Sequence, residues 1–192
     1  PSSYAPQIKK ALEMAKSGGL LLPVVYNTNA YENVETIRMF SGLVDIFLPD
    51  LKYFNNVYSV KYSHAPDYFL HASLSIHEMF HLVGALKFNG EEMLERGVVI
   101  RHLALPGLLA DSKKIIDYIA AEFGNSVYLS LMNQYTPLHN ARNFPELSSP
   151  LAEYDYELLI DHCLSLGLEN VLIQESGAAS KDFVPKFDLG GI

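Results

Sequence analysis

The chain has 192 residues, of which 49% are hydrophobic and 19% are charged, and its formal net charge is −8 at pH 7. This length and composition suit one globular domain with a sizeable core, so we expect a single domain over residues 1–192. The negative charge argues against a nucleic-acid partner or an anionic membrane partner. No run approaches the roughly 20 consecutive apolar residues that span a bilayer.

Five segments have the apolar periodicity and end signals of helices. We expect the fourth helix to have Asp111 as its N-cap and to stop at Gly124. We expect the fifth to begin at Pro150, after a capping Ser149, and to end at Gly167. The expected helices cover residues 6–16, 34–40, 70–86, 112–123 and 150–167.

Short apolar runs rich in β-branched residues alternate with these helices. The expected strands are residues 21–26, 43–48, 98–105, 127–132 and 171–174. Their apolar character is nearly continuous, as in strands covered on both faces, and the alternation predicts parallel βαβ units. We therefore predict an α/β fold with a parallel sheet, either a partial (β/α) barrel or an open doubly wound sheet. Both place ligands beyond the carboxyl ends of the strands.

Polar side chains collect at these strand ends. They are Asn27 and Asn29, Asp50 and Lys52, Arg101 and His102, and Gln134 with His139. Because parallel strands end at one edge of the sheet, we expect a ligand site there.

Asp50 and Lys52 are two residues apart, so in extended backbone their side chains point to the same side. The carboxylate could accept hydrogen bonds from ribose hydroxyls, and the ammonium could pair with a ligand carboxylate. The simpler alternative is a salt bridge at a strand end. Arg101 interrupts an apolar strand, which makes it a candidate ligand-binding residue. The structural alternative is an ion pair with Asp50 or another acid across the sheet.

The other candidates have stronger structural alternatives. His102 points to the opposite face from Arg101, as a structural histidine would. Asn27 and Asn29 could close a strand as an Asx turn. Gln134 and His139 could lie in a solvated loop.

Residues 77–81 read His-Glu-Met-Phe-His, the HExxH pattern of zinc hydrolases. No third ligand follows at the usual local spacing, and the α/β pattern is not that of such an enzyme. The alternative is a structural helix in which Ile76, Met79, Phe80 and Val83 pack inward.

Cys163 is the single cysteine, which excludes an internal disulfide and favours a reducing compartment such as the cytoplasm. One cysteine also leaves no room for an iron–sulfur cluster motif.

Several collinear segments resemble one known family. They are residues 24–29 (VVYNTN), 44–52 (VDIFLPDLK), 65–68 (APDY), 78–84, 99–107 (VIRHLALPG), 132–135 (MNQY), 144–147 (FPEL) and 183–188 (FVPKFD). In order and number these segments resemble the pyruvate formate-lyase activating enzymes of the radical S-adenosylmethionine (SAM) superfamily, and above all their less characterised relatives.

The resemblance implies a partial (β/α)6 barrel with SAM and a [4Fe-4S] cluster held by a three-cysteine loop. Reductive cleavage of SAM would give a 5′-deoxyadenosyl radical, which in activating enzymes abstracts hydrogen from a glycine of a partner enzyme. Asp50 and Lys52 match the family's Asp-x-Lys, which contacts the SAM ribose and carboxylate, and Arg101 matches an arginine near the ligand. Asn27 and Ala30 depart from the family's D-T-N-G motif, which weakens a glycyl-radical target.

We therefore expect a C-terminal fragment of a radical SAM protein, truncated at its N-terminus. The loop that binds the cluster would lie before Pro1, and residues 1–4 would be the end of a loop that binds the ligand. The fragment would be inactive alone. The residues expected to line the SAM site are Asn27, Asn29, Asp50, Lys52, Arg101 and Gln134. The fragment could also pair with a second copy through the sheet edge that truncation exposes. Two alternatives remain: a binding module without radical chemistry, and a zinc hydrolase.

Overall fold

The computed structural model describes residues 2–138, 141 and 143–174. Residues 175–192, which hold the last matched segment, and His139 and Pro1 lie outside this range.

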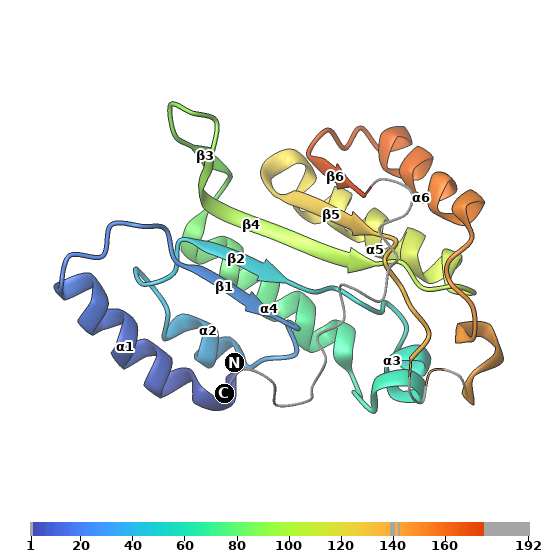
Figure 1. Cartoon of the computed structure of the whole chain (residues 1–192), viewed down its shortest axis with the longest axis horizontal. Coiled ribbons are helices and arrows are strands. Elements are labelled where there is room, and N and C mark those ends of the chain that lie inside the picture. Colours follow the sequence, from blue (N-terminus) through green and yellow to red (C-terminus); the bar gives the residue numbers. More distant parts are fainter. Residues whose placement is uncertain (1, 139–140, 142, 175–192) are drawn as a thin grey trace.

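Among the described residues, the centre of the molecule is an open sheet of five parallel strands in sequence order (Figure 1). They are β1 (Val25–Thr28), β2 (Ile46–Pro49), β4 (Leu94–Leu103), β5 (Tyr128–Met132) and β6 (Val171–Ile173). A short strand, β3 (Lys87–Phe88), pairs antiparallel with the start of β4. A doubly wound sheet would reverse its strand order, so the sequential order identifies a partial (β/α) barrel and confirms the predicted fold class.

In the part of the chain that the structure describes, six α-helices connect and flank the strands. They are α1 (Ala5–Ser17), α2 (Val34–Arg38), α3 (Asn56–Ser63), α4 (Tyr68–Val83), α5 (Leu109–Glu122) and α6 (Glu153–Ser165). The five expected helices are all present, whereas α3 and β3 were not expected. The α3 helix starts where the Asn55 side chain accepts a hydrogen bond from the Val57 N–H, and it ends at Ser63, before His64 in the left-handed region.

Several predicted element ends are wrong. Asp111 does not cap α5, which starts at Leu109; its carboxylate turns inward and accepts hydrogen bonds from the N–H groups of Phe54 (2.9 Å) and Asn55 (3.0 Å). The α6 helix starts at Glu153 rather than at Pro150. The β1 strand extends to Thr28, so Asn27 lies within it, and β4 begins at Leu94 because β3 pairs with its first residues.

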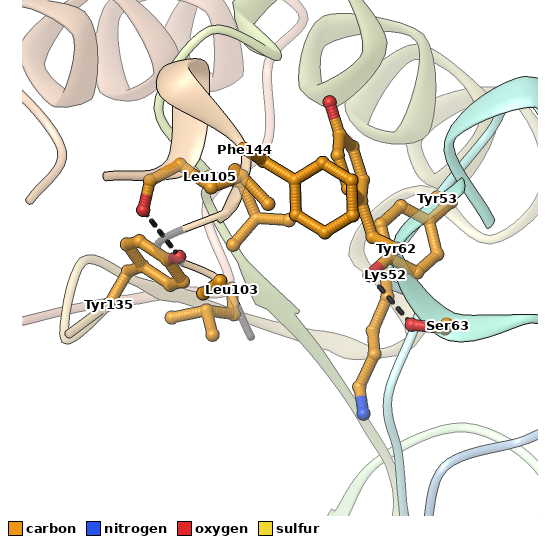
Figure 2. A pocket seen from close by; sticks show the side chains of 10 residues that line it. Lys52, Tyr53, Tyr62, Ser63, Leu103, Leu105, Tyr135 and Phe144 are labelled. Carbon is orange, nitrogen blue, oxygen red and sulfur yellow. Dashed lines mark hydrogen bonds between the residues drawn. The ribbon is translucent and has the colours of Figure 1, made fainter. Parts of the chain in front are cut away.

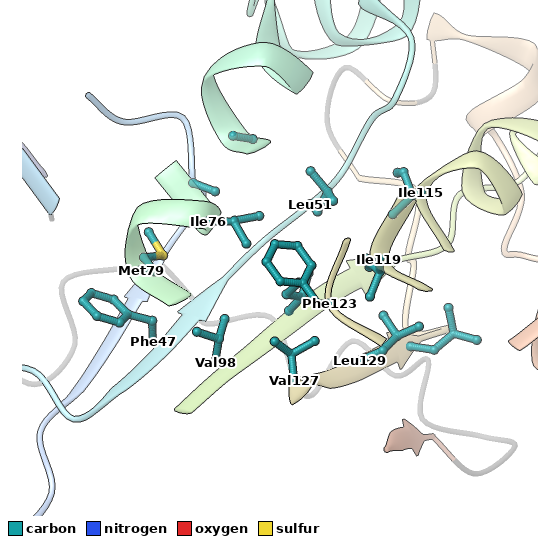
Figure 3. Close-up of a cluster of buried hydrophobic side chains, with 14 of the residues drawn as sticks. Phe47, Leu51, Ile76, Met79, Val98, Ile115, Ile119, Phe123, Val127 and Leu129 are labelled. Atoms are coloured by element: carbon teal, nitrogen blue, oxygen red, sulfur yellow. The ribbon is translucent and has the colours of Figure 1, made fainter. Parts of the chain in front are cut away.

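The hydrophobic core lies between one face of the sheet and the helices (Figure 3). Phe47 of β2, Val98 of β4 and Leu129 of β5 point into it, where Ile76 of α4 and Ile119 of α5 meet them. Burial of such side chains is the main stabilising contribution to the fold. Among the described residues, no helix is both long and apolar enough to cross a membrane.

The other face of the sheet, which we call the inner face, is only partly covered by described residues. Alternation along each strand directs Asn27 of β1, Arg101 of β4 and Ser130 of β5 to it, and Asp50 continues the same face beyond β2. Side chains near the carboxyl ends of the strands therefore lie where ligands bind in folds of this class.

The outer edge of β1 has no strand partner among the described residues, and the Val25 side chain on this strand is 53% exposed. An open edge of a parallel sheet is a template for pairing with another chain. We predict that the chain self-associates through β1 and that Val25→Lys makes it monomeric. The measurement is size-exclusion chromatography with light scattering.

The matched control is Val60→Lys on α3, where the valine is 43% exposed and lies away from β1. Val60→Lys should leave the association unchanged. A monodisperse wild-type monomer at the working concentration would contradict the prediction.

Candidate functional site

Four predicted site residues form one polar cluster on the inner face. Arg101 Nη2 lies 2.5 Å from Asp50 Oδ1 and donates a hydrogen bond to Asn27 Oδ1 at 2.7 Å. Lys52 Nζ lies 3.3 Å from Asp50 Oδ2. The structural alternatives considered for Asp50, Lys52 and Arg101 are therefore present in the fold, because the three side chains pair with one another. We call Asn27, Asp50, Lys52 and Arg101 the inner-face cluster.

The strand register brings the cluster together. Asp50 is bridged to Arg101 in parallel register, and the Leu51 N–H donates to the Arg101 carbonyl at 2.9 Å. On the other side, the Asp50 N–H donates to the Thr28 carbonyl of β1 at 2.9 Å. The carboxylate of Asp50 therefore stands between the strands that carry Asn27 and Arg101.

The charges of the cluster favour an anionic ligand. One carboxylate, Asp50, faces two cations, Lys52 and Arg101, so the cluster is net positive within a chain of net charge −8. Arg101 Nε is buried and donates no hydrogen bond to any described residue. The Lys52 side chain is 40% exposed. The site thus retains donor capacity for a carboxylate or a similar anion.

An aromatic pocket of about 270 Å³ lies beside Lys52 of the cluster. Figure 2 shows the side chains that line this pocket. The Lys52 side chain lines it, as does Leu103, which lies on the same face of β4 as Arg101. Most of the remaining wall is aromatic or apolar: Tyr53, Tyr62, Tyr135, Phe144, Leu105 and Leu147. Such a wall suits a planar or apolar group, while the cluster holds a charged group beside it.

The segment after β5 closes one side of the pocket. Tyr135 donates its hydroxyl hydrogen to the Leu147 carbonyl at 2.9 Å. Glu146 pairs with Lys61 and accepts from the Tyr62 hydroxyl, and these contacts hold the pKa of Glu146 at about 2. The Phe144 ring meets the Tyr62 ring edge-on at 5.0 Å. Helix α3 is thereby joined to the loop that follows β5.

Two predicted site residues lie outside the cluster. The Asn29 side chain accepts the Tyr31 N–H at 3.1 Å, which is the Asx turn considered as its alternative. Gln134 accepts a hydrogen bond from Gln174 at 3.2 Å, next to the end of β6. Neither makes a described contact with Asp50, Lys52 or Arg101.

Ala30, which stands where the resembled family has glycine, has a φ of +61°. This left-handed conformation favours glycine, and here neighbours hold it in place. The Ala30 N–H donates to Thr28 Oγ1 at 3.2 Å, and the Ala30 carbonyl accepts from Ser75 Oγ at 2.6 Å. Buried Glu32 accepts from the Tyr26 hydroxyl at 3.2 Å and pairs with Thr28. The turn therefore keeps its conformation without a glycine.

The HExxH residues do not converge on one point. Glu78 binds Arg38 through both oxygens, at 3.1 and 3.2 Å, while His77 lies 3.5 Å from Glu122 and packs on Phe123. Ile76, Met79 and Val83 are buried, and Phe80 packs against the core, as the structural alternative predicts. In the described part of the chain, no group of three or more His, Cys, Asp or Glu side chains could hold a metal ion.

The sequence did not identify the aromatic residues of this region as candidate site residues. Tyr53, Tyr62, Tyr135 and Phe144 come from three parts of the chain, and only Tyr135 and Phe144 stand in matched segments, MNQY and FPEL. Tyr68 stands in the matched segment APDY, and its hydroxyl contacts the backbone at the ends of β1 and β2. One signal was available, because the chain holds 12 tyrosines, several of them close to the expected strand ends.

No protein-family model matches this sequence. The uncharacterized protein MJ0674 of Methanocaldococcus jannaschii is 30% identical over 141 residues, which are 73% of this chain and 37% of that protein. The chain thus spans little more than a third of the length of this curated relative.

Among solved structures, a domain of a pyruvate-formate lyase-activating enzyme from Bacteroides vulgatus superposes with a TM-score of 0.61. The match covers 91% of this chain and 94% of that domain at 15% sequence identity. At this identity the likeness shows the fold, and it agrees with the partial barrel described above.

The buried His102, next to Arg101, makes the stability of the fold depend on pH. Its side chain is 1% exposed, Nδ1 donates to the Leu51 carbonyl at 2.8 Å, and burial lowers the histidine pKa to about 4 from 6.5. Between these values the unfolded chain binds a proton that the folded chain does not. The free energy of unfolding should therefore fall as pH drops from 6.5 to 4, by up to about 3 kcal/mol from this group.

Urea unfolding at several pH values measures this loss. His102→Asn, which keeps a donor for the Leu51 carbonyl, should flatten the curve in that window, whereas His81→Asn at an exposed position should not. An unchanged pH dependence in His102→Asn would show that other groups cause the loss.

Proposed function

We propose that this chain is the ligand-lining part of a radical SAM protein related to pyruvate formate-lyase activating enzymes. The observation that carries the proposal is the inner-face cluster beside an aromatic pocket, both beyond the carboxyl ends of parallel strands. The sequence resemblance and the shared fold support it. The proposed ligand of the chain itself is SAM.

The side chains fit the chemical groups of SAM. Asp50 can accept hydrogen bonds from ribose hydroxyls, as a carboxylate in this position should. Lys52 and the exposed part of the Arg101 side chain can hold the ligand carboxylate. The rings of Tyr53 and Tyr135 offer an apolar surface to the adenine. The donor set matches a ligand that combines an anionic group, a diol and a planar base.

When bound and reductively cleaved in the longer protein, SAM would supply a radical that abstracts hydrogen from a substrate. The role of this chain's residues would be to bind and orient it: the cluster fixes the charged end, and the pocket walls exclude water from the base. The reaction's substrate is left open. Asn27, which accepts a hydrogen bond from Arg101, stands where the family has aspartate, and this departure weakens the case for a glycine of a partner enzyme as the substrate.

An iron–sulfur cluster does not fit the residues of this chain. Cys163 is its single cysteine; it is 1% exposed in α6, and burial raises its pKa to about 11. A buried, protonated thiol cannot serve as a cluster ligand without unfolding its surroundings. We therefore place the [4Fe-4S] cluster in the longer protein and assign no radical step to these residues.

This lack of cluster ligands favours a second candidate function. A barrel-derived module could bind SAM, or another ligand with an anionic group and a planar base, without radical chemistry. The two candidates share the same cluster and pocket. They differ in whether the longer protein carries three closely spaced cysteines upstream of this segment.

Binding by the chain alone tests the site. Without a cluster to anchor the ligand, we predict weak binding, with a Kd of about 1 mM or higher. Heteronuclear NMR titration with SAM should shift the amide signals of residues 50–52 and 101–103. Lys52→Met should lower the affinity roughly tenfold, because it removes a charge-assisted contact.

The matched control is Lys10→Met on the exposed side of α1, which should leave the affinity unchanged. Shifts confined to residues outside the cluster and pocket would contradict SAM binding at this site.

Reconstitution of the longer protein tests the radical chemistry. Anaerobic incubation with iron and sulfide should produce the absorption of an iron–sulfur cluster and allow reductive cleavage of SAM. A protein that has the upstream sequence but no cysteine triplet would favour the binding module instead.

A further inference from the structure

A single hydroxyl group, that of Tyr68, contacts the backbone of both strand ends that carry the candidate site. Tyr68 Oη lies 2.8 Å from the Asp50 carbonyl oxygen and 3.1 Å from the Asn29 carbonyl oxygen. It also accepts a hydrogen bond from the Lys52 N–H at 3.1 Å. A phenol has one hydrogen and two lone pairs, so it can donate to one carbonyl while accepting from Lys52.

These contacts occur where strand pairing ends. The last backbone hydrogen bond between β1 and the chain after β2 runs from the Asp50 N–H to the Thr28 carbonyl. At the next residue, the Leu51 N–H turns to the Arg101 carbonyl of β4. The following N–H, of Lys52, again faces the β1 side, where β1 has already ended. The Tyr68 hydroxyl takes the place that a further β1 residue would have occupied.

Tyr68 itself is held firmly. It is the first residue of α4, and its side chain is 3% exposed. Its ring stacks on Tyr31 at 5.9 Å and meets the Tyr53 ring edge-on at 5.7 Å. Burial raises the pKa of Tyr68 well above its usual value, so the hydroxyl keeps its proton at neutral pH. The hydroxyl is thus a fixed donor and acceptor rather than a titrating group.

We infer that Tyr68 is a positioning residue of the candidate site. By acting as a strand partner for residues 50–52, it keeps this segment extended, so that Asp50 and Lys52 share the inner face. Extended backbone is the condition for two side chains at i and i+2 to act on one ligand. The functional consequence rests on the proposed function, because it assigns the ligand contacts to Asp50 and Lys52.

The test is Tyr68→Phe, which removes the hydroxyl and keeps the ring between Tyr31 and Tyr53. Amide hydrogen exchange of the ligand-free chain should become at least tenfold faster at Lys52, which loses its acceptor. Exchange at Leu51 should stay unchanged, because its acceptor is the Arg101 carbonyl. In the NMR titration, the affinity for SAM should fall roughly tenfold.

The matched control is Tyr53→Phe. The Tyr53 hydroxyl lies 2.9 Å from Ser63 Oγ and touches neither strand end, so Lys52 exchange should not change in this variant. Ring packing near the pocket is preserved in both variants, so only the lost hydroxyl differs.

Three results for Tyr68→Phe would overturn the inference. The first is an unchanged amide exchange rate at Lys52, and the second is an equal increase of the exchange rates at Lys52 and Leu51. The third is faster exchange at Lys52 alone without a loss of affinity for SAM. The equal acceleration would show a general loss of stability instead. If the wild-type chain binds no SAM, the proposed function fails, while selective exchange at Lys52 would still support the placement of residues 50–52 by Tyr68.

Discussion

The pairing of Asp50 with Arg101 across β2 and β4 is the interaction on which the candidate site depends. It joins two strands at their carboxyl ends, and Asn27 and Lys52 are attached through one partner each. A partly buried ion pair is weak evidence for stability, because desolvation offsets much of its Coulombic attraction. Apolar residues at these positions could give a sheet at least as stable. Under the proposed function, the pair instead holds charged groups ready for a ligand.

The layout of the fold places this pair on the inner face of the sheet. Sequential parallel strands place their crossover helices on one face, where the core forms, and leave the inner face partly uncovered by described residues. Phe47 and Arg101 illustrate the division, since the first is fully buried under α4 and the second faces the inner side. The same alternation that builds the core therefore builds the site. The Tyr68 hydroxyl keeps residues 50–52 extended, so the alternation of side chains continues past the last residues of β1.

Much of the fold could be predicted from the sequence, because near-continuous apolar strands and periodic helices are strong local signals. The parallel sheet and the five expected helices followed from them, whereas α3 and β3 did not. The α3 helix depends on a cap at Asn55, and β3 on pairing with β4, neither of which apolar periodicity reveals. Asp111 reads as an N-cap in the sequence, but tertiary contacts with Phe54 and Asn55 direct it inward instead.

The candidate site was predictable in part for the same reason. Asp50, Lys52 and Arg101 interrupt or end apolar strands, so their position is visible in the sequence. The pocket is not, because its rings come from segments far apart in the chain and meet only through the fold.

A crystal structure of the chain grown with SAM tests the central claim most directly. The account predicts that the ligand carboxylate contacts Lys52 and Arg101, that its ribose contacts Asp50, and that its adenine lies among the aromatic rings of the pocket. A ligand bound away from the inner face, or crystals without ligand at concentrations well above the Kd measured for the chain, would contradict the account.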